Sequence, residues 1–465
     1  MTVAEATPDL EQVDRNDRAF LGHPKGLGYL GFTEGCERFS YYSMQTLLVL
    51  YMVNYLLMPG RMEKVIGLEW LQAHVYHGIS GQPLASAIFG TYTSLVYGTP
   101  ILGGIIADKW LGRDKTLILG GILMAIGHFL MAIESAFVFA LLALLLGVGA
   151  FKGNIATQVG ALYRQNDLRR AMAFQIFYIF INVSVIVAPL ISGTLGQKVG
   201  WHYGFGCAGV VMVLGLIIYL SGRRYLPAEE LVAPSEEPAL REPLTRDDWM
   251  CVLYLIILIP VMAVSLLTNQ QIFNAYLTWG DQHFDLTLLN NTSSWLITVD
   301  AAVSFTMLVA VAAFWKWYGT RGREPDEITK IIIGSIFTVA GGLCLFMAAL
   351  TQPPGGKISL FWPMMFELCN SIGFAHVLPI SLALFSKIAP KQITATVVGL
   401  YYLSFFIANA VVGYVGGLYS SLPTTTFWLI HVASAAFGLV AFAVFKIVLG
   451  KRMTSGAKEQ AAALS

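Results

Sequence analysis

The sequence predicts an all-α membrane protein with twelve transmembrane helices in two six-helix bundles. Hydrophobic residues make up 56 % of the 465 residues and charged residues only 12 %, about half the charged share of a soluble globular protein. Twelve stretches also reach the roughly 20 apolar residues that a helix needs to span a bilayer core. This composition excludes a soluble enzyme, and the formal net charge of +1 argues against a nucleic-acid-binding protein.

The apolar stretches cover almost the whole chain. We expect spans at about 30–58, 84–107, 115–133, 137–161, 172–196, 203–222, 249–275, 293–317, 328–351, 359–386, 394–418 and 426–449. They define a tail (1–25), an N-terminal bundle (26–222), a linker (223–248), a C-terminal bundle (249–450) and a second tail (451–465). The linker is distinguished by mixed charges and by Pro227, Pro234, Pro238 and Pro243.

The positions of Lys and Arg predict the topology. With the N-terminus inside, most of the 29 basic residues fall on the cytoplasmic side, and Arg61, Lys64, Lys198 and Lys357 fall outside. Because cytoplasmic loops are enriched in Lys and Arg, both termini are expected inside. Two bundles joined by a long cytoplasmic loop are typical of alternating-access transporters, whose substrates bind between the halves.

Motifs for catalysis or metal binding are not found. The five cysteines, Cys36, Cys207, Cys251, Cys344 and Cys369, are scattered without a CxxC spacing, so neither a zinc site nor a disulfide framework is indicated. No HExxH or GxSxG motif lies within a span, and the histidines are dispersed. We therefore expect no catalytic residue, no metal site and no cofactor.

The loop after the second span contains a G-x-x-x-D-x-x-x-G-R pattern, from Gly104 to Arg113. Gly104 is expected to permit a close helix contact, and Asp108 and Arg113 to pair as a gate at the cytoplasmic mouth. The pattern resembles the signature of the major facilitator superfamily. The alternative is an ordinary charged tight loop.

The first span carries an unusual group of ionisable residues. In EGCERFSYY, three- and four-residue spacings put Glu34, Glu37, Arg38, Tyr41 and Tyr42 on one helix face. Charges inside a membrane are costly and are typical of functional sites. Since one arginine neutralises only one of the two carboxylates, the other is a candidate proton-binding group. The alternative is an ion-pair network that only joins helices.

This stretch resembles the first-helix motif of the proton-coupled oligopeptide transporter family. The resemblance extends from about residue 22 to 450. It includes GHPKGL from Gly22, SLVYGTPILGG from Ser94, FKGN from Phe151, FYIFIN from Phe177, RGREP from Arg321 and the separate Lys330. It implies that proton coupling involves Glu34, Glu37, Arg38 and Lys152. A lysine in a wet cavity can exchange a glutamate partner for a substrate carboxylate, although Lys152 can also be a snorkelling residue.

The resemblance also indicates positions that bind substrate, to which we add two acids by hypothesis. The positions are Arg38, Tyr41, Tyr42, Gln45, Tyr97, Lys152, Tyr178, Asn182, Ser265, Phe374 and Tyr401, and the two acids are Asp300 and Glu367. Tyrosine offers both an apolar face and a hydroxyl group, which suits a site that accepts varied side chains. Simple packing remains the alternative role for each tyrosine.

Three of these positions depart from the family pattern. Gln45 stands where the family usually has a second arginine, and Ser265 where it has a tryptophan. Phe374 replaces the glutamate that meets the peptide amine. We hypothesise that Asp300 or Glu367 takes that role. The alternatives are a helix–helix contact for Asp300 and a position facing outside water for Glu367.

The resemblance implies a proton-coupled symporter of the bacterial inner membrane that imports di- or tripeptides. The proton is then the coupling ion, and the partners are a small peptide and the lipid bilayer around a monomer. An alternative is a symporter of the same fold for a modified peptide, an amino-acid conjugate or an anion. A receptor that does not transport is a further alternative.

Overall fold

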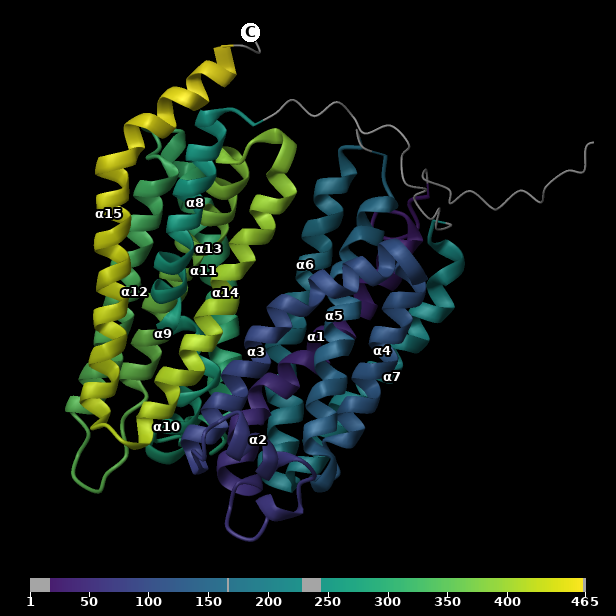
Figure 1. The fold of residues 1–465 in the computed structure, drawn as a ribbon, viewed down its shortest axis with the longest axis vertical. Coiled ribbons are helices and arrows are strands. Elements are labelled where there is room, and N and C mark those ends of the chain that lie inside the picture. The colour runs from purple at the N-terminus through teal and green to yellow at the C-terminus, as the bar shows by residue number, and fades with distance from the viewer. Residues whose placement is uncertain (1–16, 165–166, 228–243, 463–465) are drawn as a thin grey trace, which may run out of the picture. The chain divides into compact units, whose positions relative to one another are not determined.

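The computed structural model describes residues 17–164, 167–227 and 244–462. The predicted tails up to residue 16 and after residue 462, and linker residues 228–243, lie outside the described residues. The helices in Figure 1 are α1 (Lys25–Tyr51), α2 (Leu68–His74), α3 (Gly81–Ile106), α4 (Arg113–Leu130), α5 (Phe137–Ala161), α6 (Arg169–Ala188), α7 (Trp201–Gly222), α8 (Arg246–Ser265), α9 (Leu267–Gln270), α10 (Ala275–His283), α11 (Trp295–Gly319), α12 (Glu327–Leu350), α13 (Phe361–Ile388), α14 (Thr394–Gly417) and α15 (Thr424–Ala462).

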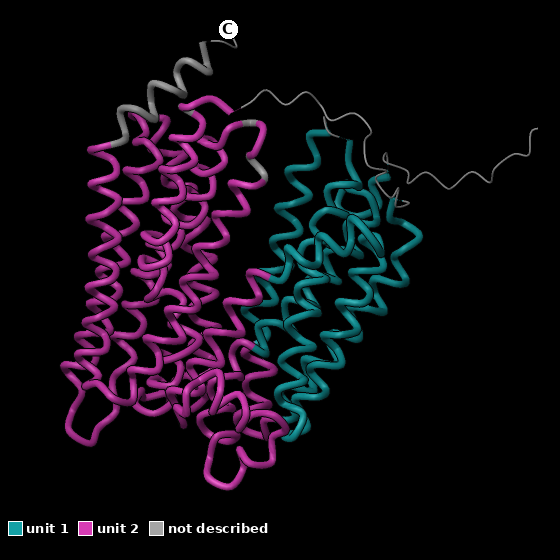
Figure 2. The backbone as a smooth tube through the Cα atoms, viewed as in Figure 1, with its two compact units in different colours: residues 1–44, 99–188, 202–236 teal, residues 45–98, 189–201, 237–465 magenta. Residues whose placement is uncertain are grey.

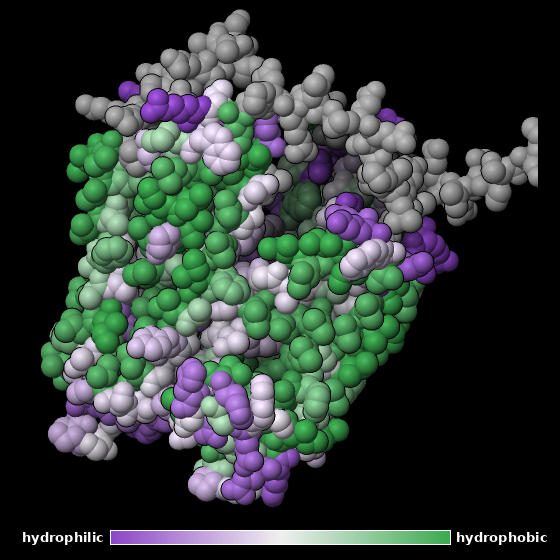
Figure 3. All heavy atoms as spheres, viewed as in Figure 1, coloured by the Kyte–Doolittle hydropathy of each residue, from purple (hydrophilic) through white to green (hydrophobic). Residues whose placement is uncertain are grey.

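The long helices coincide with the predicted spans. Within the described ranges, nine helices are long and apolar enough to cross a membrane. The other three predicted spans coincide with α1, α3 and α4. Figure 3 shows hydrophobic residues along the sides of the helices and hydrophilic residues gathered near their ends, as expected for helices surrounded by lipid.

Contacts divide the chain into two compact units (Figure 2). Unit 1 contains residues 1–44, 99–188 and 202–236, and unit 2 contains residues 45–98, 189–201 and 237–465. The boundaries pass through α1 and α3. Both units therefore contain residues of the first six predicted spans.

Helices of unit 1 approach closely at glycines. A Cβ atom built on Gly120 of α4 would lie 2.7 Å from the carbonyl oxygen of Gly147 on α5. One built on Gly103 of α3 would lie 2.1 Å from the carbonyl oxygen of Gly149. Small residues that allow backbones to touch are a common means of association for helices in lipid. A Cβ atom built on Gly104 would have nothing within 4 Å. The close helix contact expected at Gly104 is therefore made by Gly103 instead.

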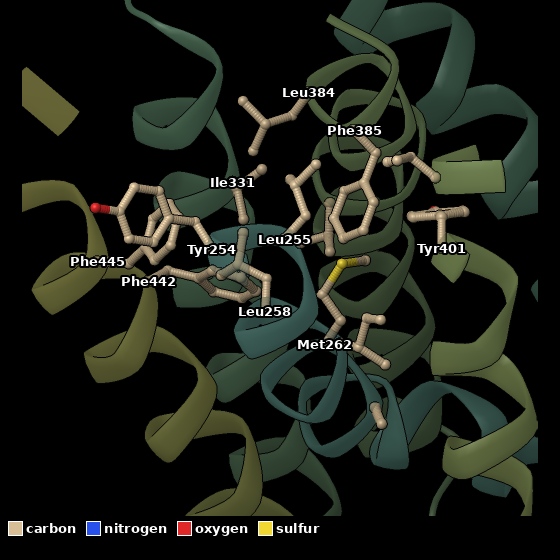
Figure 4. Close-up of a cluster of buried hydrophobic side chains, with 14 of the residues drawn as sticks. Tyr254, Leu255, Leu258, Met262, Ile331, Leu384, Phe385, Tyr401, Phe442 and Phe445 are labelled. Atoms are coloured by element: carbon tan, nitrogen blue, oxygen red, sulfur yellow. The ribbon is translucent and has the colours of Figure 1, made fainter. Parts of the chain in front are cut away.

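Unit 2 has an apolar core and a similar glycine contact. Figure 4 shows the core cluster, in which Leu255 and Met262 of α8 lie near Phe385 of α13. A Cβ atom on Gly373 of α13 would lie 3.0 Å from the carbonyl oxygen of Gly334 on α12. Since α4–α5 and α12–α13 are the third and fourth spans of their halves, the two halves pack this helix pair in the same way.

The seventh predicted span is not one continuous helix. α8 ends at Ser265, and the chain continues as α9, a 3₁₀ turn (Gln271–Phe273) and α10. The polar run from Thr268 to Gln271 lies at this interruption. Non-helical backbone at membrane depth is tolerated where protein surrounds it, and Thr268 and Gln271 are buried.

Candidate functional site

The acidic and basic groups of α1 form a buried cluster in unit 1. Glu34, Glu37 and Arg38 are 4 %, 0 % and 5 % exposed. Arg38 Nε lies 2.9 Å from Glu34 Oε1 and 2.5 Å from Glu37 Oε2. Glu34 lies three and four residues before Glu37 and Arg38, so it is their neighbour on one helix face, whereas Glu37 directly precedes Arg38 in the chain. Two carboxylates thus share one guanidinium group.

Lys152 of α5 is the fourth charged group of this cluster. It interacts electrostatically with Glu34, Glu37 and Arg38, and its side chain is half-buried. With both acids ionised, the two carboxylates balance the two cations. A single added proton therefore leaves the cluster with one positive charge.

The predicted aromatic residues of unit 1 lie on α1 and α6. The ring of Tyr41 lies 5.3 Å from the Arg38 guanidinium and 5.1 Å, edge to face, from the ring of Tyr42. Tyr178 is 61 % exposed. Asn182 donates to the carbonyl oxygen of Tyr178 at 2.8 Å, so one of its amide hydrogens is engaged within α6. Tyr41 is thus in direct contact with the charged cluster.

A histidine that sequence reasoning passed over lies beside the same helix. The Nε2 atom of His128 on α4 is hydrogen-bonded to the hydroxyl of Ser40 on α1, and both residues are fully buried. Its position as an ionisable residue inside the predicted third span was the sequence feature that could have marked His128 as a candidate. No pairing with Ser40 follows from the spacing, because the two residues are 88 positions apart.

The predicted gate residues form an ion pair. Asp108 Oδ1 and Arg113 Nη2 lie 3.6 Å apart, and the two side chains are 66 % and 38 % exposed. Gly112 between them has a φ angle of 79°, a conformation that favours glycine. Because exposed pairs of this kind contribute little to stability, a gating role would depend on their pairing in one conformational state.

Two predicted substrate-binding residues of unit 2 line one cavity. Ser265 of α8 and Phe374 of α13 share it with Asn269 and Asn370. Ser335 and Thr338 of α12 complete its polar lining. The small side chain of Ser265 leaves room for this cavity, as expected from the tryptophan-to-serine departure.

Asp300 and Glu367 were alternative candidates for one role, and the structure brings them together. Ser304 and Ser371, one turn further along the same two helices, lie 2.9 Å apart, and the two carboxyl groups act on each other electrostatically. Glu367 is 0 % exposed and accepts a hydrogen bond from the Tyr276 hydroxyl at 2.7 Å. Glu367 therefore does not face outside water, whereas Asp300 is only partly buried.

The remaining predicted residues are also in unit 2. Gln45 is buried. The ring of Tyr97 stacks on Phe405 at 5.1 Å. Tyr401 is 1 % exposed and donates to the carbonyl oxygen of Leu378 at 3.0 Å. Tyr401 is thus enclosed in the core with its hydroxyl engaged, which favours the packing alternative for this tyrosine.

A polar network in unit 2 was not predicted. Asp281 of α10 accepts hydrogen bonds from Asn54 at 2.9 Å, Ser293 at 2.7 Å and Gln197 at 3.2 Å. These residues lie next to the ends of predicted spans, where polar residues are common, so the sequence offered no distinguishing signal. The network joins segments from both halves of the sequence.

The sequence matches a known superfamily of membrane proteins. The model of the Major Facilitator Superfamily matches residues 36–413. This chain belongs to the major facilitator superfamily. The predicted fold class, twelve transmembrane helices in two six-helix bundles, is confirmed. The superfamily is a family of transporters rather than of enzymes.

Individual relatives of this chain are peptide transporters. The "Di-/tripeptide transporter" of Lactococcus lactis subsp. cremoris is 27 % identical, with 95 % of this chain and 99 % of the relative covered. The "Peptide transporter YePEPT" of Yersinia enterocolitica is 28 % identical, with 86 % and 89 % covered. A crystal structure of the peptide transporter POT in complex with sulfate has a TM-score of 0.79 at 25 % identity, covering 94 % and 96 %. The resemblance to the proton-coupled oligopeptide transporter family is confirmed.

Proposed function

We propose that this protein is a proton-coupled symporter that imports di- or tripeptides, or peptide-like compounds, by alternating access. The relatives named as peptide transporters support the substrate class. The observation that carries the proposal is the buried cluster on α1, in which two carboxylates lie within 2.9 Å of one guanidinium. A buried group that can change its charge by one proton is what coupling requires.

Charge balance links the proton to the substrate. The cluster of Glu34, Glu37, Arg38 and Lys152 is neutral when both acids are ionised. Protonation of one acid releases a cation from its partner, and a substrate carboxylate can then bind it. The loaded cluster is again neutral, which favours a closed, water-excluding state. Proton and peptide therefore move together because each compensates the charge of the other.

The substrate amine needs an acidic partner elsewhere. Phe374 cannot supply a charge, and Glu367 is enclosed by protein. Asp300 is partly exposed and has one carboxyl oxygen without a hydrogen-bond partner, which supports it as the residue that meets the amine. Gln45 stands where the family has a charged residue and Ser265 where it has a large one. These departures favour peptide-like substrates that vary in charge and size.

The other parts of the proposal follow from topology. The Asp281 network would hold the outer ends of the helices together in one state of the cycle, and the Asp108–Arg113 pair would act at the cytoplasmic end. The distribution of Lys and Arg supports an inner-membrane protein with both termini in the cytoplasm. It would act as a monomer in lipid, with the proton as coupling ion and no cofactor.

Uptake into proteoliposomes tests the proposal. A radiolabelled dipeptide is offered with an acidic outside, and competitors are dipeptides, tripeptides and free amino acids. We expect accumulation only with the inward proton gradient, and competition by peptides but not by amino acids. Driven uptake of another compound without peptide competition would favour the alternative substrates. Binding without flux would indicate a receptor.

A further inference from the structure

Unit 2 contains a second pair of buried acids, far from the α1 cluster in sequence. Asp300 of α11 and Glu367 of α13 are neighbours, because Ser304 and Ser371, one turn further along the same two helices, lie 2.9 Å apart. Tyr276 of α10 donates to Glu367 at 2.7 Å. In the described part of the chain, the titratable groups acting on either carboxyl are the other carboxyl and Tyr276. No Lys, Arg or His is among them.

The neighbouring helices offer no cation to the pair. Lys316 lies 16 residues along α11 from Asp300, more than four helical turns away. Most titratable groups on α12, α13 and α14 have partners of their own. These are Cys344 with Cys369, Lys330 with Glu324, His376 with Trp315, Lys387 with Glu327, Tyr401 with the backbone of Leu378, and Tyr402 with Tyr401. Tyr414 of α14 is 75 % exposed.

Two neighbouring buried acids without a cation favour a state in which they hold one proton. Two ionised carboxylates have no hydrogen to donate, and like charges in contact repel strongly in a poorly solvated site. Two carboxyl groups that share one proton form a hydrogen bond and carry one negative charge between them. The donor from Tyr276 stabilises this remaining charge on Glu367.

A second observation indicates a polar ligand nearby. Asn370 follows Glu367 by one turn on α13, is 2 % exposed, and its Nδ2 atom has no hydrogen-bond partner. It lines the cavity shared by Ser265 and Asn269. A buried amide that lines a polar cavity suits a bound water molecule. Such a water would offer the acids a polar group with which to exchange their proton.

We propose that Asp300 and Glu367 hold one proton between them and form a second proton-binding site, which presents a single negative charge to a substrate amine. The part of the inference that concerns the amine rests on the proposed function. The part that concerns the proton does not. The site uses residues of α10, α11 and α13, and none of the α1 cluster.

Infrared spectroscopy of the purified protein tests for the shared proton. The carbonyl band of protonated carboxyl groups, identified by its shift in D2O, is compared between wild type, Glu367→Gln, Asp300→Asn and the double variant near neutral pH. Glutamine at 367 can still accept from Tyr276, so the fold should survive. We expect the double variant Glu367→Gln/Asp300→Asn to lose the intensity of one protonated carboxyl, whereas the single buried acid left in either single variant can keep the proton. Ser304→Ala is the matched control, because Ser304 contacts Ser371 between the same two helices at 2.9 Å.

Substrate binding tests the charge. We expect Asp300→Asn to reduce the affinity for a dipeptide roughly tenfold relative to the N-acetylated dipeptide, the loss expected for a hydrogen bond to a charged group. Ser304→Ala should not change this ratio. An unchanged ratio in Asp300→Asn would refute the amine contact.

The outcomes separate this inference from the proposed function. Band intensity equal to wild type in the double variant would overturn the shared proton, even if driven uptake is observed. A band that appears only when sodium is replaced by choline would mean a metal cation is the ligand, and would also overturn it. Absence of driven uptake in the wild type would refute the proposed function and leave the band unaffected.

Discussion

Replacing Glu37 by glutamine should uncouple uptake from the proton gradient. Glu37 is 0 % exposed and lies 2.5 Å from Arg38 Nε. Glutamine has the same shape but no titratable group, so the variant imitates the protonated cluster permanently. Glu34 remains 2.9 Å from the guanidinium, which keeps Arg38 partly compensated. The cluster then carries one positive charge at all working pH values and can still bind a substrate carboxylate.

The size of the effect follows from one coupled proton. A difference of one pH unit across the membrane stores about 1.4 kcal/mol per proton, which supports about tenfold accumulation of a co-transported substrate. The wild type should approach this ratio under such a gradient at zero membrane potential. In Glu37→Gln the ratio should fall to about one. Counterflow exchange of labelled for unlabelled dipeptide should persist, because exchange needs binding but no net proton transfer.

The assay compares accumulation and counterflow in the same proteoliposomes. Glu134→Gln is a suitable control, since Glu134 is a carboxylate of unit 1 outside the cluster and should leave both activities intact. Accumulation by Glu37→Gln that equals the wild type would refute the reasoning. Loss of counterflow together with accumulation would show that Glu37 is needed for binding rather than for coupling.

Two further predictions concern stability. Gly103→Ala places a Cβ atom 2.1 Å from the carbonyl oxygen of Gly149, so α3 and α5 must separate and stability should fall by about 1–3 kcal/mol. The control Gly104→Ala, whose Cβ atom has nothing within 4 Å, should leave the Tm in detergent unchanged. Equal Tm values for the two variants would contradict this packing. Asp326 caps α12 by accepting a hydrogen bond from the Thr329 backbone N–H at 2.8 Å. Burial opposes ionisation of Asp326, but the hydrogen bonds from Thr329 and the contact with Lys446 lower its pKa overall. Its contribution should therefore be present above the ordinary carboxyl pKa of about 3.9 and be lost as the pH falls through the lowered value. Asp326→Ala should cost about 1 kcal/mol near neutral pH and Asp326→Asn much less; thermal unfolding that is equal for the two variants would argue against the cap.

The spans and the α1 cluster could be predicted because the bilayer and the helix impose simple periodicities. A membrane helix must be long and apolar, and its three- and four-residue spacings bring Glu34 beside Glu37 and Arg38. Contacts between helices depend instead on how two helices are shifted along each other. For this reason the sequence offered Asp300 and Glu367 as alternatives, although the structure pairs them. It offered no reason to connect Ser40 with His128.

Two local details were also beyond the sequence patterns. The glycine of the loop motif suggested a close contact at Gly104, but the helix face that meets α5 carries Gly103. The seventh span contains no glycine near its interruption at Ser265, and only the polar run from Thr268 to Gln271 marks it. Which polar residues a membrane helix tolerates depends on the helices around them, which a single span does not reveal.

The central claim is that proton and peptide are bound by one charge-compensated cluster and move together. The most direct measurement uses proteoliposomes with no imposed pH gradient and a pH-sensitive dye inside. An inward dipeptide gradient alone should acidify the lumen in the wild type, and it should not do so in Glu37→Gln. Peptide entry without luminal acidification in the wild type would contradict the account.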